Sequence, residues 1–225
     1  MPFSSARVAF LCLFAIAVAP PAAGQDRAPG FAREGIYVGI APQVDATLDG
    51  VSFDGLTLYE RIGGTEVAIL PKLDEQTTMR ALVGFRSRPL ALEFSLERAR
   101  HGGTFDDVPV TSVLTAFNVD SRFFFRTTQR VQPHLVLGIS IPLLRVEDGS
   151  FDDPLLGDAR WRGTGLNTEV GVTVFATPQL GLSVGYVYRP IWFTTVRGVH
   201  DEPLELLPKF RESSAHPSVM AFWTF

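Results

Sequence analysis

The sequence has 225 residues, of which 46% are hydrophobic and 20% are charged, and its formal net charge is −4. This length fits one domain, and the excess of acidic side chains argues against a nucleic-acid partner, because phosphate binding requires an excess of Lys and Arg. The one cysteine, Cys12, lies in an apolar N-terminal segment, so the sequence after it offers no disulfide, thiolate catalyst or cysteine metal site.

The N-terminal residues have the pattern of a secretory signal peptide. Arg7 precedes an apolar run over 8–18, and small residues and prolines follow over 19–24. The run is too short for a transmembrane helix, which needs about 20 apolar residues. A buried first helix is the alternative, but the prolines end the run. We therefore predict a signal peptide over 1–24, export through the general secretory pathway, and a short periplasmic segment over 25–34.

From residue 35 onward, apolar and polar residues alternate, which indicates β-strands with one apolar face. Apolar residues occupy every odd position from Leu135 to Leu143. No later stretch approaches the length of a transmembrane helix, so a membrane-spanning structure here would have to be a closed β-barrel. We predict eight strands, each long enough to provide the roughly 9 to 11 residues that a tilted transmembrane strand needs. They cover 35–48, 78–86, 90–99, 111–126, 134–146, 163–176, 181–194 and 215–225.

The connections between these strands alternate in length. The short ones are 87–89, 127–133 and 177–180, and the long polar ones are 49–77, 100–110, 147–162 and 195–214. Outer-membrane barrels have short periplasmic turns and long extracellular loops. The order therefore predicts an all-β fold, an eight-stranded antiparallel up-and-down transmembrane barrel over 35–225. Within the first long connection, 56–59 and 66–70 flank Gly63 and Gly64, which indicates a hairpin above the membrane or, alternatively, two further strands.

One apolar face per strand also fits a soluble lipocalin-like barrel, whose apolar side faces inward. Two features favour the membrane protein. The polar face is rich in glycine, as a narrow interior requires, at Gly39, Gly84, Gly138, Gly171 and Gly185. Aromatic residues lie near predicted strand ends, where outer-membrane barrels have interfacial girdles. These residues are Tyr186, Tyr188, Trp192, Phe193, Trp223 and Phe225.

Charged residues of both signs lie on the predicted inner face of the strands. They are Asp45, Arg80, Glu93, Glu97, Asp120, Arg122, Glu169 and Arg189. The lumen of a small barrel is only wide enough for side chains, so charges there must pair to offset lost hydration. In the hairpin closed at 87–89, we expect Arg80 within diagonal reach of Glu93 and Glu97. Such pairs would fill the lumen, and the alternative is that the charges line an ion pathway.

The segment 35–225 resembles the small outer-membrane β-barrels of the OmpA, OmpX and OmpW kind. Its last eight residues, SVMAFWTF, resemble their assembly signal, with alternating apolar residues and a terminal Phe, and TPQLGLSVGY at 177–186 resembles their turn-and-strand phrase. The resemblance implies a Gram-negative outer-membrane location, recognition by periplasmic chaperones and the barrel assembly machinery, and contact with outer-membrane lipid and lipopolysaccharide. We expect a monomer.

One motif suggests an enzyme. The lipid A deacylases use His-x-Ser-Asn, and His216-Pro217-Ser218 is similar, but Val219 stands where the motif has Asn. A His and a Ser on the last strand are more often polar residues of the lumen or rim than a catalytic pair. We therefore predict that the chain is not an enzyme and has no catalytic residues.

The sequence shows no convincing metal site. The histidines outside the last strand, His101, His134 and His200, lack metal-ligand spacing. Acidic pairs in the long connections are candidates for weak surface calcium. They are Asp106, Asp107, Asp152 and Asp153. We predict no cofactor and no metal, and a structural or surface-interaction role. A narrow channel for small or apolar solutes is the second hypothesis, and lipid hydrolysis is the third.

Overall fold

A computed structural model describes residues 30–44, 47–49, 59–61, 64–66, 72–105, 108–148, 160–197 and 204–225. Side chains are described within 30–42, 78–102, 111–145, 160–195 and 215–225. The predicted signal peptide and its cleavage site lie outside these residues. In the described part of the chain, no helix is long and apolar enough to cross a membrane.

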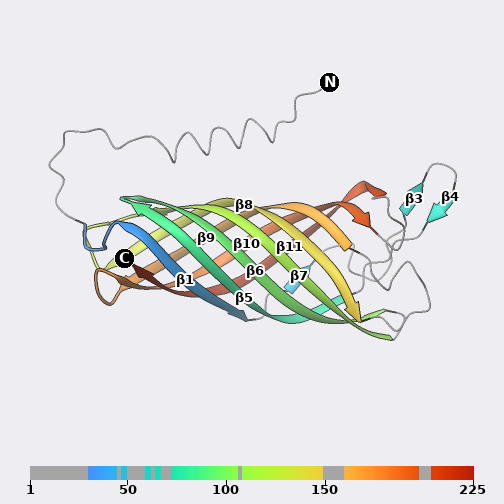
Figure 1. Ribbon diagram of the computed structural model, residues 1–225, viewed down its shortest axis with the longest axis horizontal. Helices are drawn as coiled ribbons and strands as arrows, with labels where there is room; N and C mark the ends of the chain where they lie inside the picture. The colour runs from blue at the N-terminus through green and yellow to red at the C-terminus, as the bar shows by residue number, and fades with distance from the viewer. Residues whose placement is uncertain are drawn as a thin grey trace, which may run out of the picture.

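The described residues form a closed antiparallel β-barrel (Figure 1). Its strands are β1 (Gly35–Val44), β2 (Thr47–Asp49), β5 (Lys72–Ser87), β6 (Leu90–Phe105), β7 (Val108–Phe124), β8 (Val131–Asp148), β9 (Arg160–Phe175), β10 (Leu180–Arg197) and β11 (Leu204–Thr224). From β5 to β11 each strand pairs with the next in sequence, and β1 pairs with both β5 and β11. Because β2 pairs with β11 beyond β1 and extends the first strand, the barrel has eight strands, as predicted.

The last strand closes the barrel against the first, as the sequence predicts. The register pairs Tyr37 with Thr224 and Ile40 with Ala221. At the end of the chain, the backbone N–H of Phe225 donates to the carbonyl of Ile36 at 2.9 Å. Closure matters because an open sheet edge would leave backbone donors and acceptors unpaired in the hydrocarbon.

The two faces of the wall have opposite chemistry. Over most of the wall the outward side chains are apolar and exposed, with Val170 and Val184 each 60% exposed, whereas the inward Glu93 is fully buried at 0%. A soluble barrel of the lipocalin kind would have the reverse arrangement. The soluble alternative is therefore wrong, and the outer face forms an apolar belt of the kind that meets lipid.

The strands extend farther than predicted at the end of the barrel opposite the short turns. Each strand from β5 to β11 contains 16 to 21 residues, more than the roughly 9 to 11 needed to cross a membrane. β6 and β7 stay paired as far as Phe105 and Val108. The predicted long connections at 100–110 and 195–214 are therefore wrong, because most of their residues are strand. Alternation marks a strand only where one face meets lipid, but backbone hydrogen bonding continues beyond the membrane.

The first long connection contains a short hairpin, β3 (Tyr59–Arg61) and β4 (Gly64–Glu66). These two strands pair with each other in a separate two-stranded sheet beyond one end of the barrel (Figure 1). The predicted hairpin is confirmed, although its strands are shorter than expected. The alternative of two additional barrel strands is wrong, because neither joins the wall.

The seam predicts a strong effect of replacing the terminal residue. Phe225 is 62% exposed on the outer face, so Phe225→Asp places a charge at the edge of the apolar belt and interrupts the terminal apolar stripe. We expect most of the membrane-inserted, heat-modifiable protein to be lost, with degraded or aggregated protein in its place. Thr224→Ser is the matched control and should change little, because Thr224 points inward and Ser keeps the hydroxyl. Equal urea-resistant outer-membrane association of the Asp variant and wild type, at matched expression, would contradict the prediction.

Candidate functional site

The lumen is the candidate site, because the polar side chains predicted to carry chemistry converge there. Its turn end is closed by aromatic rings from four strands. The Phe222 ring centroid lies 5.7 Å from that of Phe175 and 5.2 Å from that of Tyr37, and Phe124 lies 6.5 Å from Phe175. Gly181 makes room for this layer, because a Cβ there would overlap the Phe222 ring.

A segment before β1 covers this end of the lumen. The N–H of Phe31 donates to Thr127 in the β7–β8 turn at 2.9 Å, and the N–H of Arg33 donates to Pro178 in the β9–β10 turn at 2.8 Å. Ala32, between them, is buried against the aromatic layer. The described part of the predicted periplasmic segment, residues 30–34, is therefore a cap over the mouth of the barrel.

Arg86 lies just above this layer and was missing from the predicted charged set. Its guanidinium carbon is 3.9 Å from the Phe124 ring centroid and 5.0 Å from that of Phe175. Its Nη2 donates to Oε1 of Gln132 at 2.6 Å, whereas Nε and Nη1 have no hydrogen-bond partner among the described residues. The sequence alone could have indicated that Arg86 points inward, because residue 86 has the same parity as the inward Arg80 on a strand of period two.

The middle of the lumen holds a network of ion pairs centred on Glu93. The Arg122 Nε donates to Glu93 Oε1 at 2.7 Å, and its Nη1 donates to Glu169 Oε1 at 3.3 Å. The Tyr37 hydroxyl also donates to Glu93 Oε1, at 2.7 Å. Arg80 approaches Glu93 Oε2 at 3.7 Å and donates to Asp120. All these charged side chains are at most 5% exposed, so each depends on its partners to replace water.

A second part of the network lies nearer the loop end. Arg189 donates through Nη1 and Nη2 to both carboxylate oxygens of Glu97, each at 2.8 Å, and through Nε to Asn167 at 2.7 Å. Asn167 in turn donates to Asp120 at 2.8 Å, which links the two parts. The predicted pairing of Arg80 with Glu93 is confirmed, but its pairing with Glu97 is wrong. Glu97 lies opposite Arg80 in the register, yet its carboxylate is engaged by Arg189 from another part of the wall.

The structure places all but one of the predicted inward charges in the lumen, and Asp45 lies outside the described side chains. The lumen also holds His134, whose Nε2 is 3.0 Å from Glu169 Oε1. Its other ring nitrogen lies 3.2 Å from the Thr173 hydroxyl. Among the described residues, no three His, Cys, Asp or Glu side chains are grouped as a metal site. His200 and the loop aspartates proposed for calcium lie outside the described residues.

The loop end of the lumen is closed by apolar side chains. Leu144, Trp161, Ile191 and Phe193 are each at most 1% exposed. The rings of Trp161 and Phe193 meet edge to face with centroids 6.5 Å apart. The prediction that Phe193 belongs to an outer aromatic girdle is therefore wrong, because its parity on β10 points it inward. The other predicted girdle aromatics, including the adjacent Trp192, are at least partly exposed.

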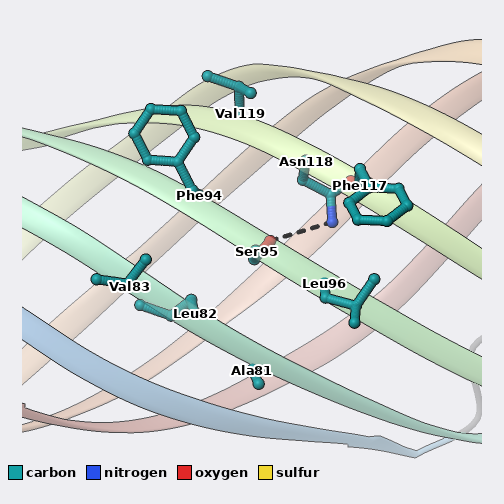
Figure 2. A pocket seen from close by; sticks show the side chains of 9 residues that line it. All are labelled: Ala81, Leu82, Val83, Phe94, Ser95, Leu96, Phe117, Asn118 and Val119. Atoms are coloured by element: carbon teal, nitrogen blue, oxygen red, sulfur yellow. Dashed lines mark hydrogen bonds between the residues drawn. The ribbon is translucent and has the colours of Figure 1, made fainter.

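A shallow apolar hollow of about 430 Å³ lies on the outer side of the wall, over β5, β6 and β7 (Figure 2). Its outward lining is Ala81, Val83, Phe94, Leu96, Phe117 and Val119. Figure 2 also shows Ser95 and Asn118, which point into the lumen and are joined by a hydrogen bond of 3.1 Å. The small side chain of Ala81 leaves space between the larger residues, so the hollow opens toward lipid rather than into the lumen.

The network predicts that its members stabilise the barrel only as pairs. Replacing Arg122 with Leu should lower the free energy of unfolding by roughly 3 to 5 kcal/mol, because it leaves buried carboxylates without their donor. Glu93→Leu should destabilise the barrel as well, because it leaves the buried guanidinium groups of Arg122 and Arg80 without this carboxylate as their partner. Urea unfolding in detergent micelles measures both, with Val170→Leu, a change between apolar residues on the outer face, as the control. Unchanged unfolding midpoints for both lumen variants would refute the prediction.

Comparison with known proteins supports the fold. The chain matches no protein-family model and no curated protein sequence. Its structure is similar to that of Neisserial surface protein A (NspA), with a TM-score of 0.54 and 19% identity over 85% of this chain and 97% of that one. The outer membrane protein OprG from Pseudomonas aeruginosa has a TM-score of 0.53 and 12% identity over 86% and 97%. The outer membrane protein AlkL has a TM-score of 0.53 and 16% identity over 92% and 97%.

The three neighbours and the chain share one architecture at nearly full length of each neighbour. The apolar belt and the polar lumen described above are the features that such an architecture requires in a membrane. The chain therefore has the fold of the small outer-membrane β-barrels, and its outward apolar belt is the surface by which such a fold spans the membrane.

Proposed function

We propose that the chain is a structural or surface-interaction protein of the outer membrane, and neither a pore nor an enzyme. The observation that supports this proposal most directly is the closed lumen. Aromatic rings and the 30–34 cap fill its turn end, ion pairs fill its middle, and apolar side chains fill its loop end. A barrel with this interior offers partners its outer wall and the strand extensions at its loop end.

A channel would require the ion pairs to separate. Arg189 on β10 binds Glu97 on β6, and Arg122 on β7 binds Glu169 on β9, so the contacts join strands that are not neighbours. Parting them would leave charges without partners in a narrow space, which is strongly unfavourable. The narrow-channel hypothesis therefore has less support than the structural one.

Lipid hydrolysis also has little support. His216 and Ser218 both point into the lumen and are 1% and 3% exposed. A catalytic pair for lipid A would have to reach an ester on the outer side of the wall, because the substrate lies in the membrane. A nucleophile and base must lie within hydrogen-bond reach of the reacting group, and the wall itself separates this pair from lipid.

The closed lumen predicts an absence of conductance. The folded barrel inserted in a planar lipid bilayer should produce no ion-conducting steps, because no continuous hydrated path passes the ion pairs. The same preparation should show heat-modifiable migration, which establishes that the inserted protein is folded. Reproducible steps that disappear when the protein is boiled before insertion would overturn the closed-lumen proposal.

The inward position of His216 predicts that lipid A stays intact. Expression of the protein in a host with a known lipid A should leave every acyl chain in place, as judged by mass spectrometry of the extracted lipid. His216→Ala provides the comparison and should give the same spectrum. Loss of an acyl chain with the wild type but not with His216→Ala would show that the chain is an enzyme.

A further inference from the structure

The charged side chains of the wall are sorted by sign. The Asp and Glu residues of the strands whose side chains the structure describes all point into the lumen. Five arginines instead are exposed on the outer face: Arg98 and Arg100 on β6, Arg145 on β8, and Arg160 and Arg162 on β9. We call these five residues the arginine patch. Every described basic side chain that points outward from the strands near the loop end belongs to it.

The register brings the arginine patch together on the surface. Arg145 lies directly opposite Arg160, and Arg100 and Arg145 are both paired with Val113 on the strand between them. Because neighbouring strands are about 4.8 Å apart, the patch is roughly 15 Å wide. Like charges directly opposite each other on one face are unfavourable, and a bound anion would offset that repulsion. Arg98 and Arg145 also interact with other groups of the protein.

The arginine patch borders the apolar belt on the side away from the short turns. On β8 the outward apolar residues run from Val131 to Leu143, and Arg145 is the next outward residue. With a rise of about 3.4 Å per residue and a tilt of about 40°, that stripe is roughly 30 Å tall, comparable with the ~25 Å apolar band of such barrels. On β8 the patch therefore begins at the edge of the apolar stripe, where lipid headgroups of the outer leaflet meet the wall.

The apolar hollow lies directly below part of the arginine patch. In the register, Ala81 is opposite Leu96 and Leu96 is opposite Phe117, and these residues line one row of the hollow (Figure 2). Arg98 is the next outward residue after Leu96 on β6. An apolar depression and a group of cations thus follow one another along the same strand, in the order in which a lipid presents its acyl chain and its headgroup.

We propose that the arginine patch and the hollow form a binding site for a phosphate-bearing lipid of the outer leaflet. Guanidinium groups bind phosphate oxygens through two parallel hydrogen bonds and hold their charge at any physiological pH. Their aliphatic stems lie along apolar surface while the charged ends reach the headgroups. The hollow takes one acyl chain. The inference rests on the proposed function to the extent that both require the barrel to span the outer membrane.

The test measures binding of two lipids to the folded barrel in neutral detergent by native mass spectrometry. One probe is lipid A with two phosphates, and the other is the same lipid after removal of both phosphates. The variant R100Q/R160Q/R162Q should bind the phosphorylated lipid about a hundredfold more weakly, given the contribution of each basic residue at an anionic surface. Wild type and variant should bind the dephosphorylated lipid equally.

Two controls separate charge and acyl chain from other effects. R33Q/R126Q/R130Q removes the same charge from exposed residues at the turn end and should leave the affinity unchanged. Ala81→Phe fills the hollow and should weaken binding of lipid A, because an acyl chain no longer fits there. Inorganic phosphate in the same concentration range as the lipid should not compete with lipid A for the wild-type barrel. Equal weakening by the two triple variants, or equal binding of the two lipids to wild type, would overturn the proposal. Full competition by inorganic phosphate would overturn the lipid component.

The same preparations distinguish failure of this inference from failure of the proposed function. A barrel that conducts ions but still discriminates between the two lipids would overturn the closed-lumen proposal and uphold the lipid site. A folded, non-conducting barrel that binds both lipids equally would overturn the lipid site alone.

Discussion

A charged side chain in the middle of a narrow membrane barrel cannot reach bulk water. The outer wall faces lipid, and the lumen is only wide enough for side chains, so the lost hydration must be replaced by hydrogen-bonded opposite charge. Arg80, Arg122 and Arg189 meet this requirement by bridging four carboxylates contributed by β6, β7 and β9. Because several of these bridges join strands that are not adjacent, the network holds the cross-section of the barrel at one size.

The network fits because glycines occupy the inner face beside the largest groups. A Cβ at Gly138 would overlap the Asp120 carboxylate, and one at Gly84 would overlap the Tyr37 ring. Space given up at these positions is taken by charged and aromatic side chains from other strands. The side chains of the lumen are consequently buried against one another, as close packing of a protein interior requires. Stability and closure of the lumen therefore have the same structural cause.

The closed lumen that we propose directs attention to the outer wall as the surface available to partners. The formal net charge of −4 gives no hint of a cationic surface, because the strand carboxylates whose side chains are described lie inside and the described outward arginines of the strands gather near the loop end. Strand extension beyond the apolar belt contributes to this arrangement. It holds Arg145 and Arg160 on paired, rigid backbone rather than on loops, so their separation is set by the spacing of the sheet.

Alternation of apolar and polar residues was enough to predict eight strands, closure by the last strand and the inward side of the seven predicted charges that the structure describes, but it misplaced Phe193 and missed Arg86. A period of two residues ties a side chain to one face wherever that face meets lipid. The pairing inside the lumen was not predictable, because parity says that Glu97 points inward but not which arginine reaches it. Partner choice depends on the diameter of the closed barrel, which brings Arg189 to Glu97 and places Arg86 between Phe124 and Phe175. The positions of the strand ends at the loop end could not be predicted either, since there the backbone pairs without an apolar face to mark the strand in the sequence.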